Sequence, residues 1–289
     1  GCGKSSLLRA IAGLDPTTAG RVVLDGIDVS TLPPEKRRIG LVFQDHALFP
    51  HRRVDQNIAF GLTHLDRGAR ARRVDELLEL VRLPGVAKRY PHELSGGEQQ
   101  RIALARALAP DPAVVLLDEP FASLDPSLRD DVRTDVIEAL RLRNAAAVLV
   151  THDREEALAL GDRVAVMSAG RMLQIDRPDE VYERPSDQFV ATFLGEASFL
   201  PDPDRPGITM MARPHDLTLS RDDESTDGGA DRVMARRYLG AAWRYTVQRS
   251  DGSMVDVDLA GGPTTNPLEV GDTCTVVVDA GHPLHRLPA

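Results

Sequence analysis

The sequence predicts an α/β domain built on a parallel sheet, followed by a small all-β domain. Three apolar runs at residues 39–43, 114–117 and 147–150 each end in polar residues, as parallel strands buried on both faces do. From about residue 206, short strand-like runs alternate with Gly- and Asp-rich turns, which is typical of all-β domains. A chain of 289 residues with 42% hydrophobic residues can bury the cores that two such domains need.

The first element is a helix whose apolar residues recur at helical spacing from Leu7 to Leu14. Directly before it stands Gly1-Cys2-Gly3-Lys4-Ser5, which resembles the second half of a P-loop, G-x-x-x-x-G-K-[ST]. In a P-loop, main-chain N–H groups bind phosphates, the lysine reaches the β- and γ-phosphate oxygens, and the hydroxyl holds Mg²⁺. Because the chain begins inside this motif and without Met, we expect further residues before Gly1.

A charged helix is predicted over residues 66–82, with one apolar stripe and arginines that we interpret as a solvated face. The stripe comprises Val74, Leu77, Leu78 and Val81. Before this helix, residues 45–51 are predicted to expose aromatic and aliphatic side chains, which indicates a docking surface. His46 and His51 lie in that segment, but the loop offers no further ligands for a metal.

Residues 94–101 read Leu-Ser-Gly-Gly-Glu-Gln-Gln-Arg and predict the start of another helix. Ser95 and Glu98 form an S-x-x-E capping box. Between them, Gly96 and Gly97 leave main-chain N–H groups uncovered at the positive end of the helix, where anions and above all phosphates bind. The helix is expected to end before Pro110.

The three apolar strands deliver polar side chains at the same edge of the predicted sheet. The first strand is followed by Gln44, the second by Asp118 and Glu119, and the third by Thr151 and His152. Ligands of such sheets bind at the carboxyl ends of the strands. Asp118 suits Mg²⁺ held through a water, and Glu119 suits a general base or water-positioning group in phosphoryl transfer. His152 can bond a γ-phosphate, and the Gln44 amide can reach Mg²⁺ or the water.

The octapeptide at 94–101, together with the P-loop segment and the strand ends in this order, resembles the ATP-binding cassette (ABC) ATPases, a P-loop NTPase fold with a helical subdomain. The resemblance implies ATP and Mg²⁺ as ligands. It implies phosphate binding by Gly1, Cys2, Gly3, Lys4, Ser5 and Ser6. It implies Mg²⁺ binding by Ser5, Gln44 and Asp118, and catalysis by Glu119, His152 and Gln44.

In that family two cassettes face each other head to tail, and each ATP lies between the P-loop of one and the signature of the other. The signature acting in trans corresponds here to Leu94, Ser95, Gly96, Gly97, Glu98 and Gln99. The D-loop corresponds to Ser123, Leu124 and Asp125. A single cassette in the chain therefore implies a homodimer as the working unit.

The resemblance predicts a cassette over residues 1–175, with its helical subdomain at about 45–100. Linker helices are expected over 176–205. Residues 206–289 are expected to form an OB-like β domain, since segments 212–216 and 238–240 are similar to those of the transport-associated (TOBE) domain. Its strands are predicted at 208–211, 217–219, 233–239, 243–247, 254–259 and 273–278.

Composition narrows the class of protein. A formal net charge of −9 argues against nucleic acid as a partner. The two cysteines, Cys2 and Cys274, provide neither a disulfide framework nor metal-ligand spacing. No apolar run reaches the roughly 18 to 20 residues that span a bilayer. The chain is therefore not expected to be the membrane part of an assembly, and the resemblance implies a peripheral protein at the cytoplasmic face of the cell membrane.

The resemblance implies a subunit that hydrolyses ATP to energise solute import, with membrane permease subunits and, indirectly, an extracytoplasmic solute-binding protein as partners. Segments 43–50 and 193–196 are most similar to those of ferric-iron, polyamine or anion importers, and iron(III) is the favoured solute. In importers, the region after Gln44 receives the coupling helix of the membrane subunit. Without residues before Gly1, including the aromatic that stacks on adenine, we expect poor ATP binding.

Two other functions are alternatives to solute import. A soluble ABC ATPase acting on a macromolecular complex in translation or DNA repair typically carries two cassettes or a long coiled-coil insertion, and this acidic chain shows neither. A non-catalytic regulatory cassette is disfavoured because Glu119 and His152 are both present.

Overall fold

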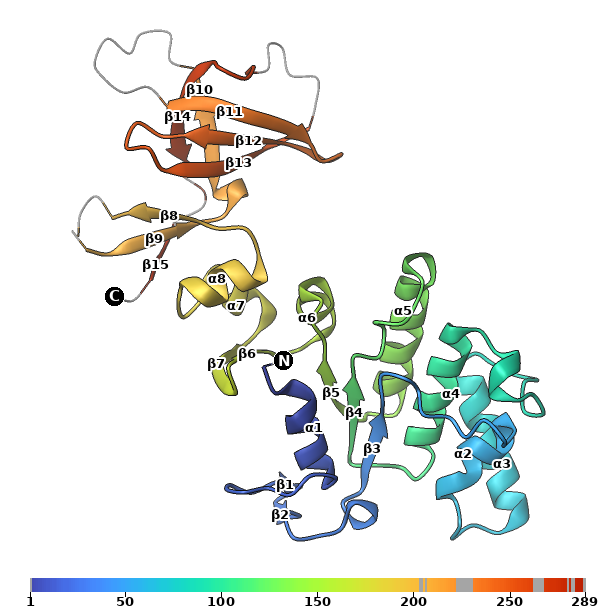
Figure 1. Ribbon diagram of the computed structural model, residues 1–289. Helices are drawn as coiled ribbons and strands as arrows, with labels where there is room; N and C mark the ends of the chain where they lie inside the picture. The colour runs from blue at the N-terminus through green and yellow to red at the C-terminus, as the bar shows by residue number, and fades with distance from the viewer. Residues whose placement is uncertain are drawn as a thin grey trace. The chain divides into compact units, whose positions relative to one another are not determined.

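The computed structural model describes residues 2–202, 205, 207–221, 231–261, 268–279, 281 and 284–287 (Figure 1). These fall into two compact units, which are described separately. The first comprises Gly1–Gly161 and Met167–Arg171, and the second Asp162–Val166 and Met172–Ala289. The domain boundaries expected near residues 175 and 205 stay predictions.

The first unit is built on a parallel sheet of order β3-β4-β5, which confirms the parallel arrangement of the three apolar runs. The strands are β3 (Ile39–Val42), β4 (Val114–Asp118) and β5 (Ala146–Val150). Leu116 packs with Leu8 of α1 (Lys4–Ala12), whereas its neighbours Val115 and Leu117 belong to the larger core on the other face. Figure 1 shows α1 and α5 (Pro126–Leu142) on opposite sides of this sheet.

Helices beside the sheet form a helical region. They are α2 (Val54–Ile58), α3 (Arg67–Leu80) and α4 (Gly96–Leu108). The apolar stripe predicted for α3 is buried, with Leu77 fully inaccessible. In α4 both halves of the predicted capping box are present: the Ser95 main-chain N–H donates to Glu98 Oε2 at 2.8 Å, and the Glu98 N–H donates to Ser95 Oγ at 3.3 Å.

The remaining elements of the first unit connect these parts. They are β1 (Val23–Leu24), β2 (Ile27–Asp28) and α6 (Arg154–Leu160). Arg37, only 5% exposed, donates to the carbonyls of Ala10 and Ile11 and so satisfies the C-terminal end of α1. β6 (Val164–Ser168) and β7 (Arg171–Asp176) form a separate two-stranded sheet, whose residues are divided between the two units.

The second unit contains two short α-helices and eight strands among its described residues after β7. The helices are α7 (Pro178–Glu183) and α8 (Gln188–Leu194). A three-stranded sheet has the order β15-β9-β8, with β8 (Ser198–Pro201), β9 (Thr209–Ala212) and β15 (His285–Leu287). A five-stranded antiparallel sheet has the order β10-β14-β11-β12-β13, with β10 (Leu217–Ser220), β11 (Asp231–Tyr238), β12 (Ala242–Gln248), β13 (Met254–Ala260) and β14 (Thr273–Val278).

This part confirms the all-β expectation and corrects it in detail. The six predicted strands are present, with ends shifted by up to two residues. The helical prediction over 176–205 is wrong at residues 198–201, which form β8, because pairing with β9 decides the local structure there. β15 was not predicted. Residues 203, 204 and 206, which flank the expected boundary near residue 205, lie outside the described residues. None of the described helices is long and apolar enough to cross a membrane.

Candidate functional site

The carboxyl ends of the three parallel strands bring the predicted polar residues to one edge of the sheet. The register pairs Val42 with Leu117, and Asp118 with Val150. Gln44 therefore follows β3, Glu119 follows β4 and His152 follows β5 at the same level. The convergence predicted from the apolar runs is observed.

Glu119 and His152 are in direct contact at this edge. His152 Nδ1 lies 3.1 Å from Glu119 Oε2. The Glu119 main chain is left-handed, with φ 45°, and its N–H bonds the Val150 carbonyl at 2.9 Å. A non-glycine residue in this conformation is strained, and such strain is found mostly at functional sites. The Glu119 side chain is 23% exposed and that of His152 66%, so the pair opens to solvent on the histidine side.

The P-loop segment reaches the same edge through Ser5. Its hydroxyl donates to Asp118 Oδ1 at 2.9 Å, which joins the start of α1 to the end of β4. Gly3 has φ 96°, a left-handed conformation that favours glycine, and Lys4 Nζ lies 3.4 Å from Cys2 Sγ. The first turn of α1 contains no acidic residue, so its positive end and Lys4 together favour an anion. Ser6 is exposed on α1, and Gly1 lies outside the described residues.

The signature segment occupies the start of α4. Ser95 and Gly96 are exposed, whereas Gly97 and Leu94 are buried. A Cβ on Gly97 would lie 2.9 Å from a Val132 methyl group, so this glycine also lets α4 approach α5 closely. Gln99 donates to the carbonyls of Pro91 and Leu94 and so braces the preceding turn. Within the described part of the chain, no hydrogen bond or ion pair joins the signature to the P-loop residues.

The D-loop residues combine packing with exposure. Leu124 is buried, and its carbonyl accepts from Arg129 Nη2 at 3.3 Å. Asp125 caps α5 by accepting from the Ser127 N–H at 3.2 Å. Ser123 is exposed. The structure therefore gives two of the three residues a local structural role.

A buried ionic network behind His152 was missed by the sequence reasoning. Glu156, 4% exposed, accepts from Thr151 Oγ1 at 2.6 Å and from Arg133 Nη2 at 2.9 Å. The Thr151 hydroxyl in turn accepts from the Asp153 N–H at 2.9 Å, which fixes the chain on both sides of His152. Asp153-x-x-Glu156 looks like a capping box in the sequence, and that pattern would direct Glu156 to the helix end instead of the interior.

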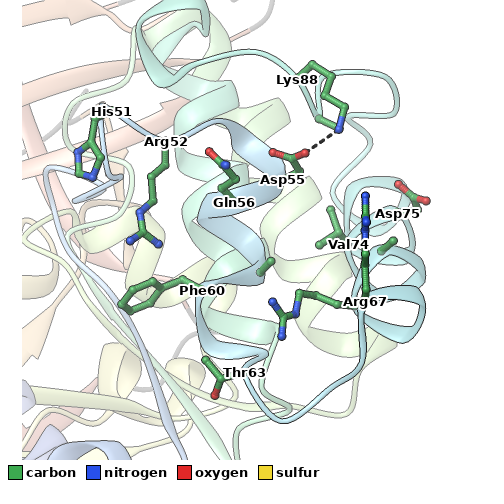
Figure 2. Close-up of a pocket in the computed structure, with 14 residues that line it drawn as sticks. His51, Arg52, Asp55, Gln56, Phe60, Thr63, Arg67, Val74, Asp75 and Lys88 are labelled. Carbon is green, nitrogen blue, oxygen red and sulfur yellow. Dashed lines mark hydrogen bonds and ion pairs between the residues drawn. The ribbon is translucent and has the colours of Figure 1, made fainter.

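A groove of about 910 Å³ lies between α2 and α3 (Figure 2). Its lining includes the half-exposed Phe60, the acids Asp55 and Asp75, and four cationic residues. The cationic residues are Arg52, Arg67, Arg70 and Lys88. Lys88 Nζ bonds Asp55 Oδ2 at 2.8 Å. Burial raises the pKa of Asp55, but the Lys88 hydrogen bond and the charge of Arg53 outweigh it, and the net pKa is lowered.

The structure around the groove differs from two expectations, the exposure of segment 45–51 and the solvated arginine face of α3. His46 is only 7% exposed, and Leu48 and Phe49 are half-buried, so segment 45–51 is less exposed than predicted. Phe49 packs on Phe60, with ring centroids 4.7 Å apart. Arg70 does not belong to a solvated face, because it lines the groove and donates to the carbonyls of Leu62 and Leu65.

Comparison with known proteins agrees with this architecture. Residues 1–122 match the family described as ABC transporter, and residues 210–284 match the TOBE domain family. The chain is 39% identical to the spermidine/putrescine import ATP-binding protein PotA of Pseudomonas fluorescens Pf-5, over 97% of this chain and 85% of the relative. It is 45% identical to the Fe(3+) ions import ATP-binding protein FbpC of Streptomyces avermitilis, over 87% of this chain and 78% of the relative.

A solved structure is also similar: a dimeric post-hydrolysis state of the ATP-binding cassette MJ0796 bound to ADP and Pi. It is 31% identical, with a TM-score of 0.54, over 61% of this chain and 81% of that chain. The chain spans 56% of the length of PotA from Pseudomonas fluorescens Pf0-1, to which it is 54% identical. It likewise spans 61% of the sulfate/thiosulfate import ATP-binding protein CysA 2 of Chromobacterium violaceum. With its cassette, its TOBE domain and these relatives, the chain belongs to the family of ATP-binding subunits of ABC import systems.

Proposed function

We propose that this protein hydrolyses ATP at the carboxyl edge of the β3-β4-β5 sheet and thereby energises solute import. The observation that carries the proposal is the pair of contacts at this edge, Ser5 with Asp118 and Glu119 with His152. One contact supplies oxygen ligands beside the positive end of α1. The other supplies a carboxylate held by an imidazole where an attacking water would stand.

The residues present fit Mg-ATP. Ser5 Oγ and Asp118 Oδ1, 2.9 Å apart, are the hard oxygen donors that Mg²⁺ takes, and the exposed Gln44 offers a third. Bound here, Mg²⁺ would neutralise charge on the phosphates. The triphosphate would lie against the N–H groups at the start of α1, with Lys4 close to its terminal oxygens.

In the proposed hydrolysis, a water attacks the γ-phosphorus, the bond to the β-phosphate oxygen breaks, and ADP and phosphate form. Glu119 orients the water and accepts its proton. His152 fixes the Glu119 carboxylate through the 3.1 Å contact and can donate to the γ-phosphate. Lys4 stabilises charge on the transferred group.

A head-to-tail dimer would complete the site. The exposed Ser95 and Gly96 begin α4 with uncovered main-chain N–H groups, a second phosphate-binding helix end. Because the described contacts of this chain leave the signature separate from the P-loop, we assign it to the ATP of a second copy. The dimeric state of the similar solved cassette supports this assignment.

The proposed membrane partner is a permease whose cytoplasmic helix lies in the α2–α3 groove at the cytoplasmic face of the membrane, with an extracytoplasmic solute-binding protein acting indirectly. The names of the relatives, all import subunits, support a permease partner. For the solute we propose iron(III), since two FbpC relatives are 45% and 55% identical over 87% and 68% of this chain.

The test is uptake by a deletion strain of the source organism, complemented with the wild-type gene or with the Glu119→Gln variant, together with purification of the full-length protein from its membranes. We expect iron(III) uptake to return only with wild type, and a multi-span permease to copurify. Loss of polyamine or sulfate uptake with normal iron uptake would replace iron(III) as the solute. Copurification of ribosomes or DNA-repair factors without a permease would overturn import itself.

A further inference from the structure

The chain makes a strained turn directly after Gln44. His46 and Ala47 both have left-handed main chains, with φ 61° and 45°, and neither is glycine. Each such residue costs on the order of 1–3 kcal/mol and persists only when surrounding groups hold it. A neighbouring group must therefore hold this turn.

Arg106, near the C-terminal end of α4, is that group. Its Nη1 donates to the Ala47 carbonyl at 2.7 Å and its Nη2 to the His46 carbonyl at 3.0 Å. The same guanidinium lies 5.6 Å from the centre of the Phe49 ring. One planar fork thus fixes both strained carbonyls and the aromatic residue that follows them.

The held turn is continuous with the wall of the groove. Phe49 packs on Phe60, and the Arg52 guanidinium lies 5.1 and 5.2 Å from the centres of these two rings. Arg52 and Phe60 both line the groove (Figure 2). The fully buried Asn57 bonds the main-chain N–H and C=O of Phe49, so the groove wall and the turn are packed as one body.

The turn is equally close to the catalytic edge, since only Asp45 separates Gln44 from His46. Arg106 also belongs to the helix whose first residues are Gly96 and Gly97. A shift of the groove wall therefore reaches Gln44 along the chain, and the start of α4 along a helix, through the Arg106 fork.

We propose that Arg106 is the positioning residue through which a permease helix seated in the α2–α3 groove controls the placement of Gln44, and hence the rate of ATP hydrolysis. This proposal rests on the proposed function and adds a regulatory route to it. Without the fork, groove occupancy no longer fixes the 46–47 turn, and binding of the permease no longer accelerates hydrolysis.

Arg73 provides a matched control. It lies on α3 and donates to the carbonyls of Leu108 and Ala109 at 3.3 and 3.4 Å. It thus bonds two main-chain carbonyls at the end of α4, as Arg106 bonds two carbonyls of the turn, but no hydrogen bond among the described residues links it to residues 46–47.

The experiment compares wild type with Arg106→Met, Arg106→Lys and Arg73→Met. Each full-length subunit is assayed for ATP hydrolysis alone and after assembly with its copurifying permease in lipid vesicles. We expect Arg106→Met to lower the ratio of stimulated to unstimulated kcat by about tenfold, with KM for ATP within about twofold of wild type. Arg73→Met should keep the wild-type ratio.

Arg106→Lys covers the case in which the Met variant fails to fold or assemble. It keeps the positive charge, but its single nitrogen does not reproduce the two nitrogen donors that the planar guanidinium holds in fixed geometry, so the ratio should still fall. A wild-type ratio in either folded Arg106 variant, or an equal loss in Arg73→Met, would overturn the proposal. If wild-type protein hydrolyses no ATP with its permease, the proposed function itself fails, and this inference fails with it.

Discussion

The polar side chains at the site edge of the first unit are used differently from the buried polar side chains of the second unit. At the site edge of the first unit, the side chains keep spare bonding capacity: Gln44 after β3 and Ser5 at the start of α1 are exposed, and the Glu119 carboxylate bonds the exposed His152. In the second unit, buried polar groups make their hydrogen bonds within the protein. Arg213, 1% exposed, donates to the carbonyls of Tyr182, Ala191 and Glu196.

Other residues of the second unit follow the same rule. Asp231 accepts from the main-chain N–H groups of Ser250 and Val276 at 3.0 Å each, and Arg244 bonds both oxygens of Asp258 at 2.7 and 2.6 Å. Buried polar groups in proteins are normally satisfied in this way. The difference teaches that a polar side chain with unused hydrogen-bonding capacity indicates a ligand site. A polar side chain whose hydrogen bonds are all made within the protein indicates a structural role.

The largest effect is expected from a substitution of Glu119 that lowers ATP hydrolysis without lowering the stability of the first unit. Glu119→Gln keeps the size of the side chain and removes the charge, so hydrolysis should fall by about 10²–10⁴-fold. ATP should still bind, and the free energy of unfolding should stay within about 0.5 kcal/mol of wild type. Steady-state kinetics, nucleotide binding and urea unfolding of the full-length protein measure these three quantities. Near-normal turnover would remove Glu119 from its assigned role.

The converse effect is expected in the second unit. Arg213→Met removes the hydrogen bonds that the guanidinium donates to three carbonyls, of which Ala191 keeps its bond from the Gly195 N–H. It also removes the guanidinium from its position 4.1 Å from the centre of the Tyr182 ring. We expect this unit to lose about 3 kcal/mol of stability, while ATP hydrolysis at low temperature is retained. Arg177→Met, which removes an exposed partner of Asp179, is the control and should leave the stability close to that of wild type. Equal effects of the two substitutions would break the comparison.

Local sequence patterns were enough to predict the parts of the site whose cause is local. The capping box at Ser95 and Glu98, the end of α4 before Pro110 and the apolar stripe of α3 each depend on residues within a few positions of one another. The three strand ends were also predictable, because a short apolar run that ends in polar residues has few other structures available.

The parts that were missed depend on contacts between distant residues. Arg133 meets Glu156 across 23 positions, and Arg106 meets Ala47 across 59. In neither pair does the local sequence around one residue indicate which distant residue it contacts. β8 forms because β9 pairs with it. The burial of His46 follows from a left-handed turn, which could not be predicted because the turn contains no glycine.

Alanine substitutions at two glycines of the first unit would sharpen the comparison by showing which close contacts stabilise that unit. A Cβ on Gly40 of β3 would lie 2.7 Å from the carbonyl oxygen of Ala107, which α4 holds in place. Gly40→Ala should therefore cost about 1–3 kcal/mol. In Gly68→Ala, a Cβ meets only ordinary contacts with the side chains of Asp66 and Arg72, and helix propensity should add up to about 1 kcal/mol of stability. Chemical unfolding of both variants tests the opposite signs.

The smallest effect expected concerns pH and again the turn after Gln44. Burial lowers the pKa of His46, while Gln100 and Asp45 oppose that shift. The unfolded chain then takes up a proton near the ordinary value of about 6.5, before the folded chain does. The contribution of neutral His46 to stability is therefore fully present above that value, and it falls as the pH drops toward the lower folded pKa.

His46→Asn keeps a residue that tolerates the left-handed conformation but does not titrate, so this variant should lose less stability between about pH 7 and pH 5 than wild type. The exposed His92→Asn variant controls for removing a histidine, and urea midpoints at the two pH values give the comparison. Equal acid sensitivity in wild type and His46→Asn would mean that the folded chain accommodates the charged imidazole of His46 as well as the neutral one.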